Sequence, residues 1–214
     1  MAVLKPSKII AIGLNYFDHA KELNMPIPDH PIMFMKPSTS FIKDGQSIIY
    51  PHQSKNVHYE GELAVVIKDK IRNIVKEEAA QHIKGYTCAN DVTARDLQNI
   101  DSQWTRAKSF DTFCPLGPRI VKDLDPTNLN IQTRVNGTIK QNSNTKNMIF
   151  DVFELVSFVS SVMTLFPGDV IITGTPPGVG PLEVGDTVEI EIEGIGILKN
   201  QVILEPATKS RGSN

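Results

Sequence analysis

Two acidic residues at the start of an apolar segment are the first candidates for chemistry in this chain. Glu60 and Glu62 flank Gly61 and lead into the run LAVVI at residues 63–67, which is typical of a buried strand. Because side chains alternate along a strand, both carboxylates are expected to project from one side. Such neighbours raise each other's pKa unless a cation lies between them, and Mg²⁺ prefers oxygen ligands of this kind. The alternative is a pair of solvated acids at a strand end.

A third carboxylate, Asp91, lies between an expected strand and an expected helix, where side chains can converge on a site. If the segment from Asp91 onwards is helical, then Asp91, Arg95 and Gln98 share one face. In one interpretation Asp91 completes a metal site, and Arg95 and Gln98 are directed at an anionic ligand. In the other, Asp91 and Arg95 form a surface ion pair worth roughly a few tenths of a kcal/mol. The spacing leaves both interpretations open.

Two further polar residues lie in surroundings that could desolvate them. Lys108 lies among aromatic residues, where its ammonium could hold a carboxylate or a developing oxyanion. Alternatively its stem simply covers Trp104 or Phe110. Thr175 belongs to a Gly/Pro-rich loop, residues 174–181, which lacks the Lys-Ser/Thr ending of a nucleotide-binding P-loop. That loop either offers a hydroxyl and a backbone N–H to an anion or is a plain connector.

Histidines provide the remaining candidates. His19 and Glu22 are three residues apart and share a face of any helical turn. A carboxylate beside an imidazole fixes its tautomer and strengthens it as a general base, although a solvated helix face would show the same spacing. His58 is expected on the same strand face as Glu60 and Glu62, either as a ligand or as an edge residue.

Short strands separated by turns must position these residues. A short helix is expected near residues 15–23 with Asp18 as a possible cap, another over residues 77–84 ended by Gly85, and a hairpin at Asn136-Gly137. One long helical pattern covers residues 149–165. The expected strands are residues 8–13, 31–36, 47–50, 170–173, 187–192 and 196–204. Many strands with few helices predict an α+β, mainly β fold.

Length and composition restrict the class of protein. The 214 residues fit a single domain over residues 1–207, followed by a disordered polar tail at 208–214. A net charge of −2 argues against nucleic acid or an anionic membrane as partner. No apolar stretch is long enough to span a membrane, and no signal peptide is recognised. Cys88 and Cys114 are interpreted as reduced and buried, which favours a cytoplasmic protein.

Taken in order, these segments resemble the fumarylacetoacetate hydrolase family, and in particular its short members. The matching stretches are GLNYFDHAKE, FMKPS, VHYEGELAVVI, NDVTARDLQ, AKSFDTFCPLGP, VNG and PGDVIITGTPPGVGP. They extend from about residue 11 to residue 200, and the ordered set is far more specific than any one of them. Residues 24–30 and the C-terminal tail depart from the pattern.

The resemblance implies a mixed β-sandwich roll that forms a homodimer and binds Mg²⁺, or alternatively Mn²⁺ or Ca²⁺. It implies metal binding by Glu60, Glu62 and Asp91. It assigns substrate contacts to Arg95, Gln98 and Thr175, and catalytic roles to Lys108, His19 and Glu22. His19 and Glu22 would lie on a mobile lid, residues 15–29.

The activity implied is metal-dependent enolate chemistry on small 2-oxo acids. The first expectation is C–C bond cleavage, either hydrolysis of an acylpyruvate or fumarylacetoacetate type or decarboxylation of oxaloacetate. Isomerisation or tautomerisation of 2-hydroxymuconate-like or 2-hydroxyhepta-2,4-diene-1,7-dioate substrates is the alternative, because the same enolate serves it. A second alternative is a non-catalytic metal- or metabolite-binding protein, since a fold alone does not fix function.

Overall fold

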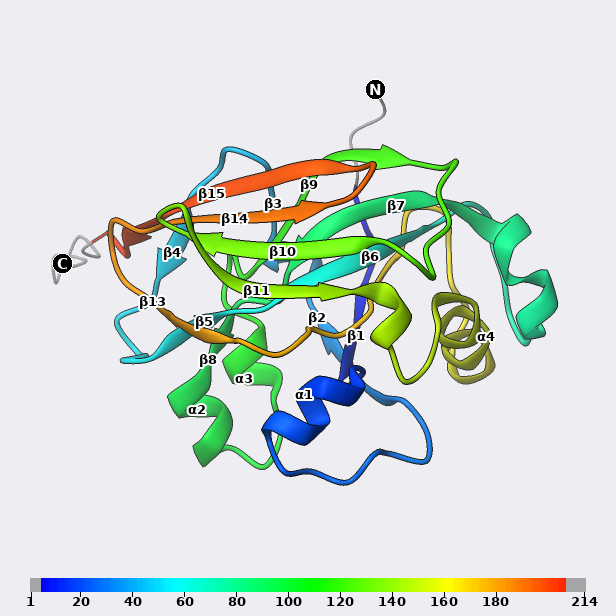
Figure 1. Ribbon diagram of the computed structural model, residues 1–214, viewed down its shortest axis with the longest axis horizontal. Helices are drawn as coiled ribbons and strands as arrows, with labels where there is room; N and C mark the ends of the chain where they lie inside the picture. Colours follow the sequence, from blue (N-terminus) through cyan, green and yellow to red (C-terminus); the bar gives the residue numbers. More distant parts are fainter. Residues whose placement is uncertain (1–4, 207–214) are drawn as a thin grey trace, which may run out of the picture.

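Three β-sheets form the body of the protein in this computed structural model, which describes residues 5–206 (Figure 1). The expected tail at residues 208–214 lies outside the described residues. The seven-stranded sheet has the order β2 (Ile32–Lys36), β1 (Ile9–Gly13), β12 (Val170–Ile172), β6 (Gly61–Ile67), β7 (Ile83–Asn90), β9 (Cys114–Val121) and β3 (Phe41–Lys43). It is mixed, because β1 pairs with β12 in parallel while β6 and β7 are antiparallel.

The other two sheets are smaller. The five-stranded sheet has the order β11 (Thr138–Asn144), β10 (Asn130–Val135), β14 (Thr187–Ile192), β15 (Gly196–Leu204) and β4 (Ile48–Tyr50). The three-stranded sheet has the order β13 (Gly180–Leu182), β5 (Val57–Tyr59) and β8 (Thr93–Ala94). The mainly β, α+β fold class is therefore confirmed, whereas the domain limits of 1–207 stay a prediction.

Helices are few and short among the described residues. They are α1 (Phe17–Glu22), α2 (Arg95–Ile100), α3 (Thr105–Lys108) and α4 (Val152–Val162), with 3₁₀ turns at Ser38–Ser40, Lys76–His82 and Thr145–Asn147. Figure 1 shows α1, α2 and α3 gathered at one end of the sheets, with α4 apart from them. No helix within residues 5–206 is both long enough and apolar enough to cross a membrane.

The main core fills the space between the seven-stranded and five-stranded sheets. Strand β6 is buried along its whole length, which explains its unbroken apolar run. Leu63, Val65 and Ile67 on one of its faces pack into a cluster that also contains residues of β10, β14 and α4. Ala64 and Val66 belong to a second cluster on the opposite face. This rigid strand is the platform from which the acidic residues project.

Several expected elements differ from the structure. The helix expected over residues 77–84 is a 3₁₀ turn that passes into β7, and Gly85 lies inside that strand. A Cβ at Gly85 would come within 2.7 Å of the Val121 carbonyl oxygen, so this glycine permits a close approach of β9. The long helix is confirmed but shorter, because Asp151 caps it through the N–H groups of Phe153 and Glu154. Asp18 does not cap α1, since its carboxylate accepts only from the N–H of His19 at that end.

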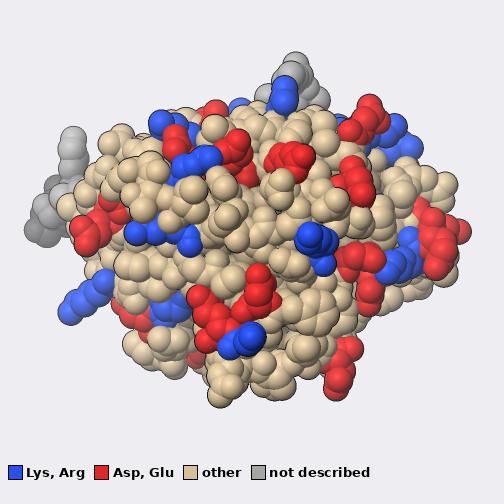
Figure 2. Space-filling model, viewed as in Figure 1, with Lys and Arg blue, Asp and Glu red and all other residues tan. Residues whose placement is uncertain are grey.

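Charged side chains are mixed on the surface. Figure 2 shows acidic and basic residues intermingled over one face, in line with the small net charge. The expectation that nucleic acid is not a partner stays a prediction.

Candidate functional site

The pairing of β6 with β7 brings the three acidic residues together. Gly61 lies opposite Asn90 in the antiparallel register, so Glu60 and Asp91, which adjoin these residues, become neighbours. The N–H of Asp91 donates to the Glu60 carbonyl at 2.9 Å, and the Asn90 side chain accepts from the Glu60 N–H at 3.0 Å. Glu62 follows on β6 itself.

The three carboxylates form one buried cluster. One oxygen from each of Glu60, Glu62 and Asp91 lies within 4.8 Å of the others, and the side chains are almost fully buried. The expectation that Asp91 shares a helix with Arg95 and Gln98 is wrong, because α2 begins only at Arg95. Asp91 reaches the cluster from the end of β7 instead. The alternative of solvated surface acids does not describe this arrangement.

Two buried lysines contact this cluster. Lys108, the last residue of α3, donates to Glu60 Oε2 at 2.9 Å and to Asp91 Oδ2 at 2.7 Å. Its ammonium also lies 5.2 Å from the centre of the Phe34 ring. Lys36, at the end of β2, donates to Asp91 Oδ1 at 2.5 Å and to the Val92 carbonyl at 3.2 Å. Neither lysine is a solvated side chain.

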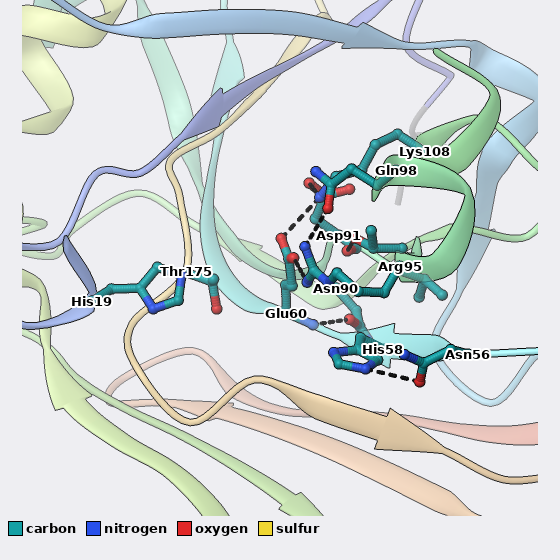
Figure 3. Close-up of polar contacts among 12 residues, drawn as sticks. His19, Asn56, His58, Glu60, Asn90, Asp91, Arg95, Gln98, Lys108 and Thr175 are labelled. Atoms are coloured by element: carbon teal, nitrogen blue, oxygen red, sulfur yellow. Dashed lines mark hydrogen bonds and ion pairs between the residues drawn. The ribbon is translucent and has the colours of Figure 1, made fainter. Parts of the chain in front are cut away.

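Arg95 and Gln98 lie on one face of α2, as their spacing predicts. Arg95 donates to Glu60 Oε1 and to Gln98 Oε1, so the guanidinium and the amide are joined at the wall of the site (Figure 3). Both residues line the cavity described below. They present N–H groups of the kind that bind a carboxylate.

The electrostatic environments of Glu60 and Glu62 differ sharply. Burial opposes ionisation of Glu60, but the contacts with Lys108 and Arg95 outweigh it and lower its pKa to about 2. Burial and the nearby carboxylates of Asp91 and Glu60 raise the pKa of Glu62 well above its usual value. Glu62 Oε2 accepts a hydrogen bond from the Gly174 N–H at 2.7 Å.

The cluster suits a hard divalent cation. Three carboxylates converge, yet Glu62 contacts no lysine or arginine among the described residues, so a positive charge is missing beside it. Oxygen donors of this type are those that Mg²⁺, Mn²⁺ and Ca²⁺ prefer. The residues present therefore fit a metal ion, and the ion's identity stays a prediction.

His19 and Glu22 approach the site from α1. His19 Nδ1 lies 2.8 Å from Glu22 Oε2, and the Gly178 N–H donates to Glu22 Oε1 at 3.1 Å. When Nδ1 carries the proton of this bond, Nε2 is left as a base. Figure 3 shows His19 and Thr175 on the side of the site opposite Lys108 and Gln98.

Thr175 and His58 line the same cavity as the acidic cluster. The Thr175 hydroxyl donates to the Gly61 carbonyl at 3.0 Å and accepts from Gln141 Nε2 at 2.8 Å, so it braces the Gly/Pro-rich loop against β6. His58 Nε2 lies 3.0 Å from Asn56 Oδ1, and burial together with Arg95 lowers the pKa of His58 to about 4. His58 is therefore neutral at physiological pH and lies at the wall of the cavity.

Most of the predicted site residues line one cavity of about 550 Å³. From the predicted set it is lined by His19, Glu60, Glu62, Asp91, Arg95, Gln98, Lys108 and Thr175. Glu22 reaches it through His19. Acids, cations and a histidine that line one cavity together are typical of an active site.

The comparison with known families agrees with this geometry. Residues 8–203 match the model of the family described as fumarylacetoacetate (FAA) hydrolase, C-terminal. The chain belongs to the fumarylacetoacetate hydrolase family. The resemblance in the sequence is therefore confirmed.

Three members of this family illustrate what the chain is similar to. An uncharacterized protein of Methanocaldococcus jannaschii is 69% identical over 199 residues, covering 93% of this chain and 84% of that protein. Human mitochondrial oxaloacetate tautomerase FAHD2A is 46% identical over 213 residues, covering 94% of this chain and 68% of that protein. The crystal structure of 5-carboxymethyl-2-hydroxymuconate delta-isomerase from Mycobacterium smegmatis is 50% identical, with a TM-score of 0.90, covering 96% of this chain and 82% of that one.

These names bear on the expected reaction. Two of them describe a tautomerase and an isomerase, which correspond to the alternative expectation, whereas a further solved relative, 43% identical and from Exiguobacterium antarcticum, is named a fumarylacetoacetate hydrolase. What they support is an enzyme family that includes tautomerases and isomerases.

Sequence reasoning gave no role to Lys36. It lies in the stretch FMKPS, where a lysine ends an apolar strand immediately before Pro37. That position is the available signal, because Lys36 is the buried residue of an otherwise partly exposed strand, and a buried lysine must find an anionic partner. Gln141 was also missed. It accepts from the Gly61 N–H at 3.0 Å and donates to Thr175, linking β11 to the acidic strand.

Proposed function

We propose that this protein is a divalent-metal-dependent enzyme that interconverts the keto and enol forms of small 2-oxo acids. The observation that carries the proposal is the cluster of Glu60, Glu62 and Asp91, which lines a cavity and is buried in contact with Lys36 and Lys108. The names of the relatives, a tautomerase and an isomerase, support this choice among the reactions that start from an enolate.

The acidic cluster holds the metal ion in this proposal. Mg²⁺ is the first candidate because all three ligands are carboxylates, with Mn²⁺ and Ca²⁺ as alternatives. When bound, the ion supplies a Lewis acid that draws electron density from the 2-oxo group. The requirement for a cation follows from Glu62, which is buried beside two other carboxylates.

The chain's own residues bind the acid and move the proton. Arg95 and Gln98 bind the substrate carboxylate through their N–H groups, and Lys108 donates to the oxygen on which negative charge develops. His19, held by Glu22, takes the proton from C3 at Nε2. The C3–H bond breaks, the C2–C3 double bond forms, and the 2-oxygen receives a proton, so the keto and enol forms exchange without loss of atoms.

A second candidate is cleavage of a C–C bond, by hydrolysis or decarboxylation. The His19–Glu22 contact at 2.8 Å favours hydrolysis, because the same base could deprotonate a water molecule. Here the enolate is a leaving group, and the products differ from the substrate in mass. Product analysis separates this candidate from the first.

The lid and the homodimer are proposals that accompany the function. Residues 15–29 include α1 and an irregular segment, and we propose that they close over bound substrate. The contacts of Glu22 with Gly178 and of Asp18 with Ser143 attach α1 to the rest of the site. Slower amide exchange of α1 with substrate present would support a lid, and a solution mass twice that of the chain would support the homodimer.

One experiment tests the proposed function directly. The protein is stripped with EDTA, Mg²⁺ or Mn²⁺ is restored, and the decay of enol-oxaloacetate is followed by ultraviolet absorbance. Exchange of C3 hydrogens of 2-oxo acids for deuterium is measured alongside. The expected result is metal-dependent acceleration of both with no change in substrate mass. Absence of any metal-dependent enolisation would refute the proposal, and pyruvate release from acetylpyruvate would favour the second candidate.

A further inference from the structure

The Gly/Pro-rich loop, residues 174–181, is bonded to two carboxylates with different tasks in the proposed reaction. At its start the Gly174 N–H donates to Glu62 Oε2 in the acidic cluster at 2.7 Å. Further along, the Gly178 N–H donates to Glu22 Oε1 at 3.1 Å, and Glu22 Oε2 lies 2.8 Å from His19 Nδ1. Backbone N–H groups of one loop therefore orient a carboxylate at the metal site and the carboxylate that holds the base.

The backbone of this loop is stiff and closely packed. Gly174 and Gly178 have φ angles of 92° and 94°, which glycine adopts readily. A Cβ at Gly178 would lie 2.2 Å from the Lys140 carbonyl oxygen, so the loop lies directly against β11. The two prolines at 176–177 restrict φ between the two glycines. The loop is thus suited to fix the two carboxylates relative to each other.

Gln141 of β11 holds the start of the loop. Its side chain is buried, and Nε2 donates to the Thr175 hydroxyl and to the Pro176 carbonyl, each at 2.8 Å. Its Oε1 accepts from the Gly61 N–H at 3.0 Å, on the strand that carries Glu62. Both N–H groups of the amide and its oxygen are therefore in use. One side chain joins the loop to the acidic strand.

Tyr59 of β5 holds the middle of the loop. Its buried hydroxyl donates to the Gly178 carbonyl at 2.8 Å. Both backbone polar groups of Gly178 are thus bonded to side chains, the carbonyl to Tyr59 and the N–H to Glu22. Among the described residues that line the cavity, neither Tyr59 nor Gln141 occurs. Any effect of these two side chains on the reaction must pass through the residues that they hold.

We propose that Gln141 and Tyr59 are positioning residues, which act through the loop at 174–181. Gln141 keeps the start of the loop in place at Glu62, and Tyr59 keeps Gly178 in place at Glu22. The inference rests on the proposed function, since it assigns residues that support the same metal site and the same base.

Tyr59→Phe tests the middle of the loop, because it removes a single hydroxyl. We expect kcat for enol decay to fall about fivefold, which corresponds to about 1 kcal/mol, as Glu22 loses its fixed partner. KM and Mn²⁺ affinity should stay unchanged, since Gln141 still holds the start of the loop. Tyr86→Phe is the matched control. Tyr86 is a buried tyrosine of β7 that does not line the cavity or bond to the loop within residues 5–206.

A double-mutant cycle with Glu22→Ala shows whether Tyr59 acts through Glu22. Glu22→Ala removes the acceptor of the Gly178 N–H, so nothing is left for Tyr59 to position. In that background Tyr59→Phe should change kcat by less than about twofold, instead of about fivefold. A general loss of structure would lower kcat by the same factor in both backgrounds. Equal factors would therefore overturn the inference.

Gln141→Met tests the start of the loop with a side chain of similar size. We expect it to weaken Mn²⁺ binding about fivefold in calorimetric titration, because Glu62 loses a fixed orientation. Gln141→Asn withdraws the amide by one methylene and should weaken Mn²⁺ in the same direction. Gln132→Met on β10 is the control, since Gln132 bonds to Asn142 at 3.2 Å and does not line the cavity. Undiminished Mn²⁺ affinity in folded Gln141→Met and Gln141→Asn would overturn the inference.

The outcomes separate this inference from the function on which it rests. Metal-dependent enolisation by the unchanged protein, together with equal factors in the cycle or undiminished Mn²⁺ affinity, would refute the inference alone. Absence of metal-dependent enolisation in the unchanged protein would refute the proposed function and the inference together. Thermal unfolding of each variant shows that the protein compared is folded.

Discussion

The ammonium of Lys36 lies 2.5 Å from Asp91 Oδ1, and both side chains are buried. The contact joins β2, an edge strand of the seven-stranded sheet, to the residue that follows β7. With Lys108 on its other oxygen, Asp91 is held by two cations. A carboxylate held in this way is fixed in orientation, which is what a metal ligand requires.

Replacement of Lys36 by Met should destabilise the metal-free protein. Asp91 would lose one of its two buried cations, at a cost of about 3 kcal/mol in the free energy of unfolding. Mg²⁺ should restore part of this loss and should bind more tightly than in the unchanged protein, because one positive charge near the site is gone. Thermal unfolding with EDTA and with Mg²⁺ measures both effects.

Lys199→Met is the control for Lys36. Lys199 pairs with Glu189 at 2.9 Å, but its side chain is 60% exposed, so the change in unfolding free energy should stay within about 0.5 kcal/mol. Equal melting temperatures of Lys36→Met and the unchanged protein in EDTA would contradict the role given to the buried pair.

Glu60 and Glu62 should respond in opposite ways to removal of their charge. Glu62→Gln keeps an acceptor for the Gly174 N–H and relieves repulsion from Asp91, so the metal-free protein should gain about 1 kcal/mol of unfolding free energy. Glu60→Gln deprives Lys108 and Arg95 of a partner and should cost about 3 kcal/mol. Denaturant unfolding in EDTA measures these changes.

Both substitutions should lower metal affinity at least tenfold, since each removes one anionic ligand. Calorimetric titration with Mn²⁺ measures this loss. Stability changes of the same sign for the two variants in EDTA would show that the two carboxylates do not differ as described. Undiminished Mn²⁺ affinity in both would remove them from the metal site.

The sequence allowed the acidic site to be predicted because its chemistry is local. Glu60 and Glu62 adjoin a run whose apolar character required burial on both faces, and Arg95 and Gln98 kept their helical spacing. The register of β6 with β7 then brought Asp91 beside Glu60, a relationship between segments that no local pattern contains.

Lys36 and the 3₁₀ turn illustrate what the sequence could not provide. Lys36 contacts Asp91 only because β2 lies near the end of β7, so its role depends on tertiary packing. The segment at residues 77–84 has good helix formers, yet Ile83 and the following residues are needed as β7 in the centre of a sheet. Tertiary pairing there overrides local propensity. Gly85 has the sequence context of a helix end, but the structure places it inside β7, where the lack of a side chain permits the close approach of β9.

Loss of the His19 imidazole should slow the reaction without weakening the metal site. His19→Gln is expected to lower kcat by about 10²–10⁴-fold with little change in KM, because a positioned general base acts mainly in the transition state. Glu22→Gln should cause a smaller loss, since Glu22 orients the ring through a bond at 2.8 Å. Enol decay and deuterium exchange measure kcat, and calorimetry measures Mn²⁺ affinity.

Lys21→Ala provides the control for His19. Lys21 is exposed on the same helix, and it does not line the cavity. Its removal should leave kcat within about twofold, a difference that corresponds to less than about 0.5 kcal/mol in the activation barrier. Full turnover by His19→Gln would show that another group moves the C3 proton.

Gly61 separates the two glutamates, and its missing side chain should matter for stability. A Cβ at this position would lie 2.1 Å from Thr133 Oγ1 and 3.1 Å from Gln141 Oε1, so Gly61→Ala should cost about 1–3 kcal/mol of unfolding free energy. The displaced strand should also weaken Mn²⁺ binding. Thr133→Ala removes the atom responsible. Its own cost should be small, because the buried Thr133 hydroxyl has no hydrogen-bond partner within residues 5–206.

The double variant Gly61→Ala, Thr133→Ala should therefore recover most of the stability lost by Gly61→Ala alone. Urea unfolding of the four proteins completes a double-mutant cycle, and the expected coupling between the two sites is about 1–2 kcal/mol. Recovery of Mn²⁺ affinity in the double variant would tie the spacing of Glu60 and Glu62 to the packing beneath Gly61. Strictly additive losses would show instead that the alanine strains the strand itself, independently of Thr133.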